Sequence, residues 1–181
     1  MRDVRTFRWL RRLSVVPRWS VMPTIRKQNV AEHSFHVASL SMWLVGLHAR
    51  GYNGKFELEV LRYALTHDVK EAIDGDMPSP SKKTEPVDAS DQVKVVVKTA
   101  DVLEAMLFMY EEQLMGNRMG VDDIIDYLYK RTEPWWDAFE KSEKYQGLSL
   151  AHLIESARFI AYNSSFSHPS IEEEEPCTPI R

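Results

Sequence analysis

Apolar residues recur every three or four positions along most of the chain, which is the spacing of an amphipathic helix. Over residues 3–14, for example, valine, phenylalanine and leucine share one face and arginines occupy the other. Neither strand-like alternation nor an internal repeat stands out. We therefore predict an all-α protein. The predicted helices cover residues 3–14, 30–50, the segment from Leu58 to Gly75, 91–115, 121–131 and 148–162.

Polar residues and prolines predict where these helices begin and end. Asn29 is followed three positions later by Glu32, in the manner of a capping box, so a helix is expected to begin at residue 30. Pro17 ends the first helix, and the segment 18–29 is expected to be an ordered loop. Pro134 is expected to end the helix over residues 121–131.

Length and composition indicate a single soluble domain. Of the 181 residues, 44% are hydrophobic and 28% are charged, which suffices for one core. We assign residues 1–165 to this domain and 166–181, rich in acids and prolines, to a solvated tail. The formal net charge of −4 gives no basic field for a nucleic-acid polymer.

The sequence also bears on the compartment. The longest apolar run, near Met42 to Leu47, is much shorter than the roughly 20 residues that a membrane span needs, so no membrane partner is expected. The single cysteine, Cys177, excludes an internal disulfide and fits a reducing compartment. We predict a cytoplasmic protein.

Histidines and acids interrupt three of the apolar patterns. His67 and Asp68 are adjacent at the rim of an apolar face, His33 lies in a largely apolar helix, and Asp101 follows an apolar run. Each has a structural interpretation as a satisfied core histidine or a paired aspartate. A buried carboxylate is costly unless it is paired or bound to a cation. Three such coincidences on three helices favour one shared site.

A shared site at these positions would offer two imidazoles and two carboxylates. This mixed set of nitrogen and oxygen donors suits a divalent metal such as Mn²⁺, Co²⁺, Fe²⁺ or Zn²⁺, which makes hydroxide available at neutral pH. Glu71 is four residues past His67, on the same face of the expected helix, where it could order or deprotonate the attacking water. Its structural alternative is a surface glutamate paired with a lysine.

The motifs RW, EHS, HDxxE, GDxPxP and KxAD occur in this order between residues 18 and 101. This ordered set resembles the HD-domain metal-dependent phosphohydrolases. Within them it resembles the 5′-deoxynucleotidase (YfbR-like) branch and its phage relatives that hydrolyse dATP to deoxyadenosine and triphosphate (DatZ-like). The resemblance implies a helical HD-domain bundle, a divalent cofactor (Co²⁺, Mn²⁺ or Mg²⁺, with Zn²⁺ also compatible) and a homo-oligomer of two or more copies.

The resemblance also implies a role for each matching position. Arg18 matches a phosphate-contacting arginine, Trp19 an aromatic against which base and sugar pack, and Asp76 the acid that reads the deoxyribose hydroxyl edge. In the triphosphate-cleaving relatives, an aliphatic residue at the position of Val21 restricts which edge of a base can enter the site. Two lysines match phosphate contacts of the triphosphate-cleaving relatives: Lys82 and Lys98. The four metal ligands are matched by His33, His67, Asp68 and Asp101, and the catalytic carboxylate by Glu71.

We therefore predict a metal-dependent hydrolase that cleaves the 5′ phosphoester of deoxynucleotides, with dATP as the favoured substrate. The first alternative is a 5′-deoxynucleotidase that acts on deoxynucleoside monophosphates. A second is another HD branch acting on a guanosine alarmone or a cyclic nucleotide. Two alternatives of other classes are a non-catalytic nucleotide sensor and a helical adaptor, although an adaptor would leave the buried acids unexplained.

Overall fold

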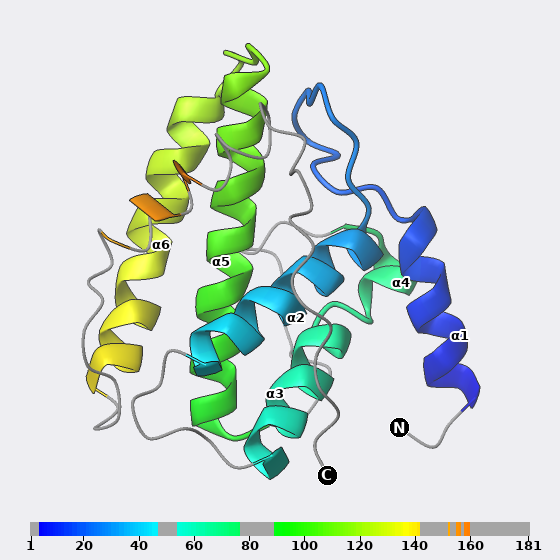
Figure 1. The fold of residues 1–181 in the computed structure, drawn as a ribbon. Coiled ribbons are helices and arrows are strands. Elements are labelled where there is room, and N and C mark those ends of the chain that lie inside the picture. The colour runs from blue at the N-terminus through cyan, green and yellow to red at the C-terminus, as the bar shows by residue number, and fades with distance from the viewer. Residues whose placement is uncertain are drawn as a thin grey trace, which may run out of the picture.

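A computed structural model describes residues 4–46, 54–76 and 89–141 and a few positions between 152 and 159. This part of the chain is helical and contains no strand, as the sequence predicts (Figure 1). The elements are α1 (Val4–Arg12), the 3₁₀ turn η1 (Leu13–Val15), α2 (Val30–Gly46), α3 (Gly54–Thr66), α4 (Glu71–Asp74), α5 (Asp91–Leu114) and α6 (Val121–Lys141).

The long helix α5 is the centre of the bundle. It packs against α2, α3 and α6, and α2 also packs against α3. In Figure 1, α6 runs alongside α5 while α2 crosses it, and α1 and α4 lie together at one side. Apolar residues of α2, α3 and α5 form the main core, and the other half of α5 forms a second core with α6. The candidate site lies where α2, α5 and the end of α3 meet.

Both predicted starts of the central helices are confirmed, at residues 30 and 91. The Asn29 side chain accepts a hydrogen bond from the Glu32 N–H at 2.9 Å, so Asn29 is the N-cap of α2. Ser90 caps α5 in the same way, through its Oγ and the Val93 N–H at 3.4 Å. These bonds satisfy N–H groups that have no partner within the first helical turn.

The prediction of one continuous helix up to Gly75 was wrong. α3 ends at Thr66, a turn covers residues 67–70, and α4 begins at Glu71. Within this turn the Val69 N–H bonds to the Thr66 carbonyl at 3.1 Å, a span of three residues instead of four. Glu71 is therefore not on the helix that ends before His67.

The turn sets the positions of three polar side chains. On one regular α-helix His67, Asp68 and Glu71 would share an arc of about 100°, whereas here two of them come from the turn and Glu71 begins α4. With the tighter turn all three are buried, with exposed fractions of 5%, 2% and 3%. The Glu71 N–H bonds to the Asp68 carbonyl at 2.9 Å, which fixes the start of α4 against the turn.

The predicted end of the last described helix was also wrong, because α6 continues through Pro134 to Lys141. Proline lacks an N–H, so this helix loses one backbone hydrogen bond. Trp136, two residues further on, is 2% exposed and packs into the main core. Burial of an indole stabilises the fold by a few kcal/mol, which is about what a proline inside a helix costs.

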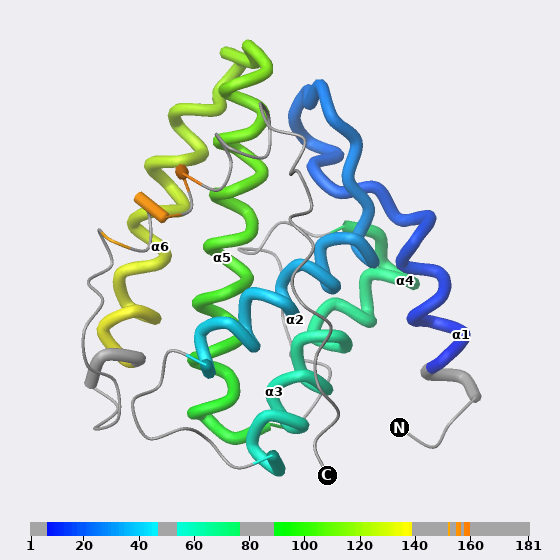
Figure 2. Tube along the Cα trace, in the orientation of Figure 1, coloured from blue at the N-terminus to red at the C-terminus, as the bar shows by residue number. Residues whose placement is uncertain are grey.

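The loop between η1 and α2 is held at both ends and at its tip. The Arg18 N–H bonds to the Gln28 carbonyl at 2.9 Å and closes its base. Near its tip the N–H groups of Ile25 and Arg26 donate to the buried carboxylate of Glu112, each at 2.7 Å. Figure 2 traces this loop beside the upper part of α5. The predicted ordered loop over residues 18–29 is thus confirmed.

Several predictions lie outside the described residues: Lys82, most of the segment 77–90, most of the helix 148–162 and the tail 166–181. Among the helices of the described ranges, none is long and apolar enough to cross a membrane.

Candidate metal and nucleotide site

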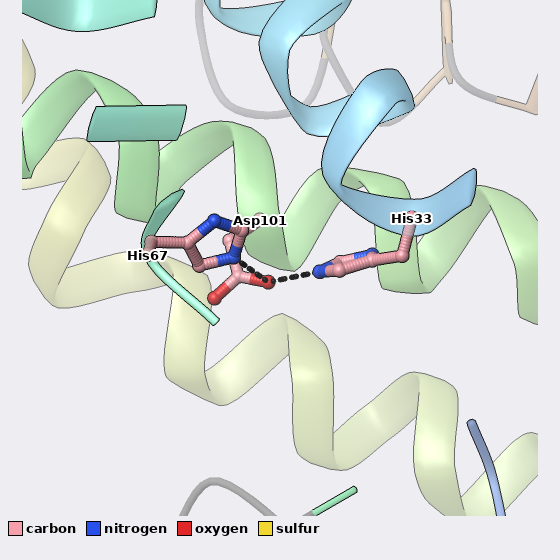
Figure 3. A group of neighbouring side chains, drawn as sticks. All are labelled: His33, His67 and Asp101. Atoms are coloured by element: carbon pink, nitrogen blue, oxygen red, sulfur yellow. Dashed lines mark ion pairs between the residues drawn. The ribbon is translucent and has the colours of Figure 1, made fainter. Parts of the chain in front are cut away.

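The four predicted metal ligands lie together in the structure. His33 comes from α2, His67 and Asp68 from the turn after α3, and Asp101 from α5. His33 Nε2 is 3.0 Å from Asp101 Oδ1 and 3.7 Å from Asp68 Oδ2. His67 Nε2 is 3.4 Å from Asp68 Oδ2 and 3.8 Å from Asp101 Oδ1. Figure 3 shows how the two imidazoles approach the Asp101 carboxylate from two sides.

These donors fit a divalent cation. Ligand atoms of His33, His67 and Asp101 all lie within 4.8 Å of one another. Each imidazole engages its Nδ1 elsewhere: that of His67 is 2.6 Å from the Ala64 carbonyl, and that of His33 contacts Glu104. The two Nε2 atoms are buried and make no hydrogen bond of good geometry, which is costly in a site without a cation. Imidazole nitrogens and carboxylate oxygens are donors that Mn²⁺, Co²⁺ and Zn²⁺ accept.

The charges around His33 favour its protonated form when no cation is bound. Burial lowers the pKa of His33 and the nearby charge of Arg18 lowers it further, but Glu104 and Asp101 outweigh both and raise it to about 9. Burial alone would raise the pKa of Asp101. The imidazoles of His33 and His67 outweigh that effect and hold the Asp101 pKa well below its usual range. A metal ion would therefore displace a proton from His33.

Two cations flank the cluster. The Arg18 guanidinium nitrogen Nη1 is 3.8 Å from Asp68 Oδ2, and Lys98 Nζ is 3.8 Å from Asp101 Oδ2. Their side chains are 13% and 19% exposed. Burial opposes the charge of Arg18, but the surrounding acids, Glu104 first among them, outweigh it and raise its pKa. An anion such as a phosphoryl group would find two fixed positive charges at this site.

Glu71 lies at the end of the same turn that carries two of the candidate ligands. Its side chain is 3% exposed and it is the first residue of α4. The turn at residues 67–70, rather than a helical face, brings it to this position. A buried carboxylate beside a metal site can accept or return a proton.

Trp19 occupies an uncommon backbone conformation beside the cluster, with φ of 59°. Its backbone N–H donates to Asp76 Oδ2 at 3.0 Å. Asp76, the residue predicted to contact the deoxyribose hydroxyl, therefore also fixes the backbone of Trp19, the residue predicted to pack against the base. The indole stacks on Phe108 with a centroid separation of 5.5 Å, and the Arg18 guanidinium lies 5.4 Å from its ring. Val21, further along the loop, is 78% exposed.

Two buried residues of the site escaped the sequence reasoning, namely Glu104 and Gln28. Glu104 is 3% exposed and contacts His33, and Gln28, also 3% exposed, donates to Glu104 at 2.6 Å. Glu104 lies three residues after Asp101, on the same helical face. Like Asp101, it is an acid within an apolar helical pattern, so the same signal could have identified it. Gln28 carries no comparable signal, because a glutamine in a loop is ordinarily exposed.

The arrangement of these residues can be compared with known proteins. Residues 5–88 match the family of YfbR-like 5′-deoxynucleotidases. This YfbR-like segment contains every candidate site residue up to Lys82, whereas Lys98 and Asp101 lie beyond it. Curated relatives named 5′-deoxynucleotidase, from Yersinia pestis and Yersinia pseudotuberculosis, are 37% identical over 90 residues. The match covers 49% of this chain and 46% of theirs, so the chain spans about half the length of these relatives.

Solved structures share the fold over most of the chain's length. The cyanophage S-2L HD phosphohydrolase DatZ, solved with dA and one catalytic Zn²⁺ ion, superposes with a TM-score of 0.62 at 19% identity, over 91% of this chain and 96% of that one. An HD-domain phosphohydrolase from Listeria innocua gives a TM-score of 0.56 at 17% identity, over 85% and 96% of the two chains. The predicted helical HD-domain fold is confirmed.

Proposed function

We propose that this protein is a metal-dependent hydrolase that cleaves the 5′ phosphoester of deoxynucleotides. The observation that carries the proposal is the meeting of His33, His67, Asp68 and Asp101 from three separate segments, with both Nε2 atoms aimed at the carboxylates. The YfbR-like match and the names of the curated relatives support the same class of reaction.

The cofactor follows from the donor set. We assign His33, His67, Asp68 and Asp101 as ligands of one divalent cation, Co²⁺ or Mn²⁺ first, with Mg²⁺ and Zn²⁺ also compatible. When bound, such an ion lowers the pKa of water toward about 7 and offsets negative charge on a phosphoryl group.

In the proposed reaction, Glu71 transfers a proton and Arg18 stabilises the phosphoryl charge. Water attacks the phosphorus that bears the 5′ oxygen, a new P–O bond forms, and the bond from phosphorus to the 5′ oxygen breaks. Glu71 takes the proton from the water, and the proton finally reaches the 5′ oxygen of the departing deoxynucleoside. Arg18, held 3.8 Å from Asp68, pairs with the phosphoryl oxygens and stabilises their charge in the transition state.

The nucleoside lies against Trp19 in this proposal. The indole is anchored on Phe108 and offers an apolar face to a base and sugar. One oxygen of Asp76 already accepts the Trp19 N–H, and the other reads the deoxyribose hydroxyl. Val21, on the same loop, restricts the base edge by contact.

Within this class we propose dATP as the substrate, giving deoxyadenosine and triphosphate. A triphosphate carries more negative charge than a monophosphate, and Lys98 places a second cation beside the site, with Nζ 3.8 Å from Asp101. Lys82 is proposed as a further phosphate contact.

A second substrate class is favoured by the relatives named 5′-deoxynucleotidase. In this alternative the protein hydrolyses deoxynucleoside monophosphates to the deoxynucleoside and orthophosphate. The attacked atom, the leaving deoxynucleoside and the residue roles are the same, because only the length of the phosphate chain on the attacked phosphorus differs. Assembly as a homo-oligomer and a cytoplasmic location stay predictions.

One product assay tests the proposal. The protein is incubated with Mn²⁺ or Co²⁺ and separate samples of dNTPs, NTPs and dNMPs, and the products are separated by chromatography. Deoxyadenosine with triphosphate supports dATP, and orthophosphate from dNMPs supports the second class. If Mn²⁺ binds but no nucleotide releases product, the hydrolase proposal is wrong and a nucleotide sensor is the better account.

A further inference from the structure

A chain of hydrogen bonds links the nucleotide side of the site to the metal side. The indole N–H of Trp19 donates to Gln28 Oε1 at 3.2 Å, and Gln28 Nε2 donates to Glu104 Oε1 at 2.6 Å. The other oxygen of Glu104 contacts His33 Nδ1. Gln28, His33 and Glu104 are each at most 3% exposed, so water does not compete for these bonds.

The chemistry of the donors sets the direction of every bond in this chain. An indole N–H can only donate, so the Gln28 amide must turn its oxygen to Trp19 and its NH₂ to Glu104. A carboxylate accepts through both oxygens, so His33 donates to it from Nδ1. In the neutral imidazole that binds a metal, the remaining ring nitrogen, Nε2, is then the one with a lone pair, and it lies 3.0 Å from Asp101 Oδ1 in the ligand cluster.

We infer that Glu104 and Gln28 form a shared support for the two halves of the site, in which Glu104 positions His33 for the metal and Gln28 positions Trp19 for the nucleoside. Both act through another residue and are therefore positioning residues. The metal part concerns His33 alone, whereas the nucleoside part rests on the proposed function. Carboxylates that orient a ligand histidine in this way typically change metal affinity by about 10- to 100-fold when they are removed.

The two parts have different expected signatures. Glu104→Gln keeps the size of the side chain but presents an NH₂ or a weaker acceptor to His33, so the Mn²⁺ dissociation constant should rise about 10- to 100-fold. Gln28→Leu removes both amide groups and leaves the contact between Glu104 and His33. Its Mn²⁺ affinity should stay within about threefold of wild type, while KM for the deoxynucleotide rises about tenfold and kcat changes little.

The experiment measures Mn²⁺ binding by isothermal titration calorimetry without any nucleotide, with folding checked by circular dichroism. Glu112→Gln is the matched control: this buried acid lies two turns along α5 and bonds to Ile25, Arg26 and Asn117 instead of a histidine. Its Mn²⁺ affinity should equal that of wild type. Glu104→Asp, which keeps the charge but shortens the reach, is the second variant should Glu104→Gln fail to fold.

The inference is overturned if folded Glu104→Gln and Glu104→Asp bind Mn²⁺ as tightly as wild type, or if Glu112→Gln loses as much affinity as they do. It is also overturned in its nucleoside part if Gln28→Leu leaves KM unchanged. A wild-type protein that binds Mn²⁺ but hydrolyses no nucleotide contradicts the proposed function alone, since the affinity comparison still decides the role of Glu104.

Discussion

Asp76 holds the backbone of Trp19 across 57 residues of sequence, with the Trp19 N–H donating to Asp76 Oδ2 at 3.0 Å. Trp19 has φ of 59°, a conformation that costs on the order of 1 kcal/mol or more for a non-glycine residue. A charge-assisted hydrogen bond contributes about 1.5–3 kcal/mol, enough to hold that conformation. The residue assigned to the sugar thus also fixes the aromatic platform beside it.

Asp76→Ala should weaken nucleotide binding more than it slows the chemical step. Without the carboxylate the Trp19 backbone can relax, so we expect KM to rise at least about tenfold and kcat to fall less than about threefold. Steady-state kinetics with the preferred deoxynucleotide measures both constants. Asp76→Asn, which keeps one acceptor oxygen, should lie between wild type and Asp76→Ala. Wild-type kinetics in Asp76→Ala would contradict this role.

Glu71→Gln should separate turnover from metal binding. The substituted glutamine would fill the same space but could not take a proton, so kcat should fall about 10²- to 10⁴-fold while Mn²⁺ affinity changes less than about threefold. Asp68→Asn, at a proposed ligand, should lose both. Single-turnover hydrolysis and calorimetry on the same preparations provide the comparison. Near-full activity in Glu71→Gln would rule out proton transfer by this residue.

The metal-free protein should lose stability as the solution becomes more basic. His33 has a folded pKa of about 9 against 6.5 for the unperturbed side chain, so its contribution is complete below pH 6.5 and lost as the pH rises through 9. The loss should be on the order of 3 kcal/mol. Urea denaturation in EDTA at about pH 6.5 and pH 9.5 measures it.

Saturating Mn²⁺ should oppose this trend, because the metal binds the deprotonated imidazole. His33→Gln is the control, and its metal-free stability should vary much less between the same two pH values. A wild-type stability in EDTA that stays constant or increases between the lower and the higher pH would show that His33 is neutral in the metal-free fold.

Glu112→Ala should destabilise the loop that carries Trp19. The buried carboxylate accepts from the N–H groups of Ile25 and Arg26 and from the Asn117 amide, each at 2.7 Å. Leaving these donors unsatisfied should lower the free energy of unfolding by about 3 kcal/mol or more. Urea denaturation at neutral pH measures the change.

The neighbouring Glu111→Ala is the control for that variant. Glu111 forms a 2.8 Å ion pair with Arg26, but its side chain is 26% exposed and the pair is screened by solvent. Its loss should cost no more than about 1 kcal/mol. Equal costs for the two variants would mean that the buried carboxylate is no anchor for the loop.

The sequence alone predicted those features in which a residue does not fit the pattern of its immediate neighbours. His33 and Asp101 stand out because a polar group in an apolar helical face needs a partner, and Asn29 because it sits where a cap is needed. The helices α2 and α5 follow from periodicity alone. These features are visible in one segment at a time.

What sequence reasoning missed depends on packing between segments. α6 continues through Pro134 and carries Trp136 into the main core, a contact with residues far away in the sequence. The turn at residues 67–70 has no signal in the apolar pattern around it. Gln28 is buried, and its side chain bonds to Trp19 of the loop and to Glu104 of α5. No local pattern in the sequence contains that information.

The central claim is that four side chains from three segments hold one cation. An anomalous-difference map from a crystal grown with Mn²⁺ tests it most directly. We expect a single strong peak within coordination distance of Nε2 of His33 and His67 and of the carboxylates of Asp68 and Asp101. The absence of a peak there, or a peak held by other residues, would contradict the account.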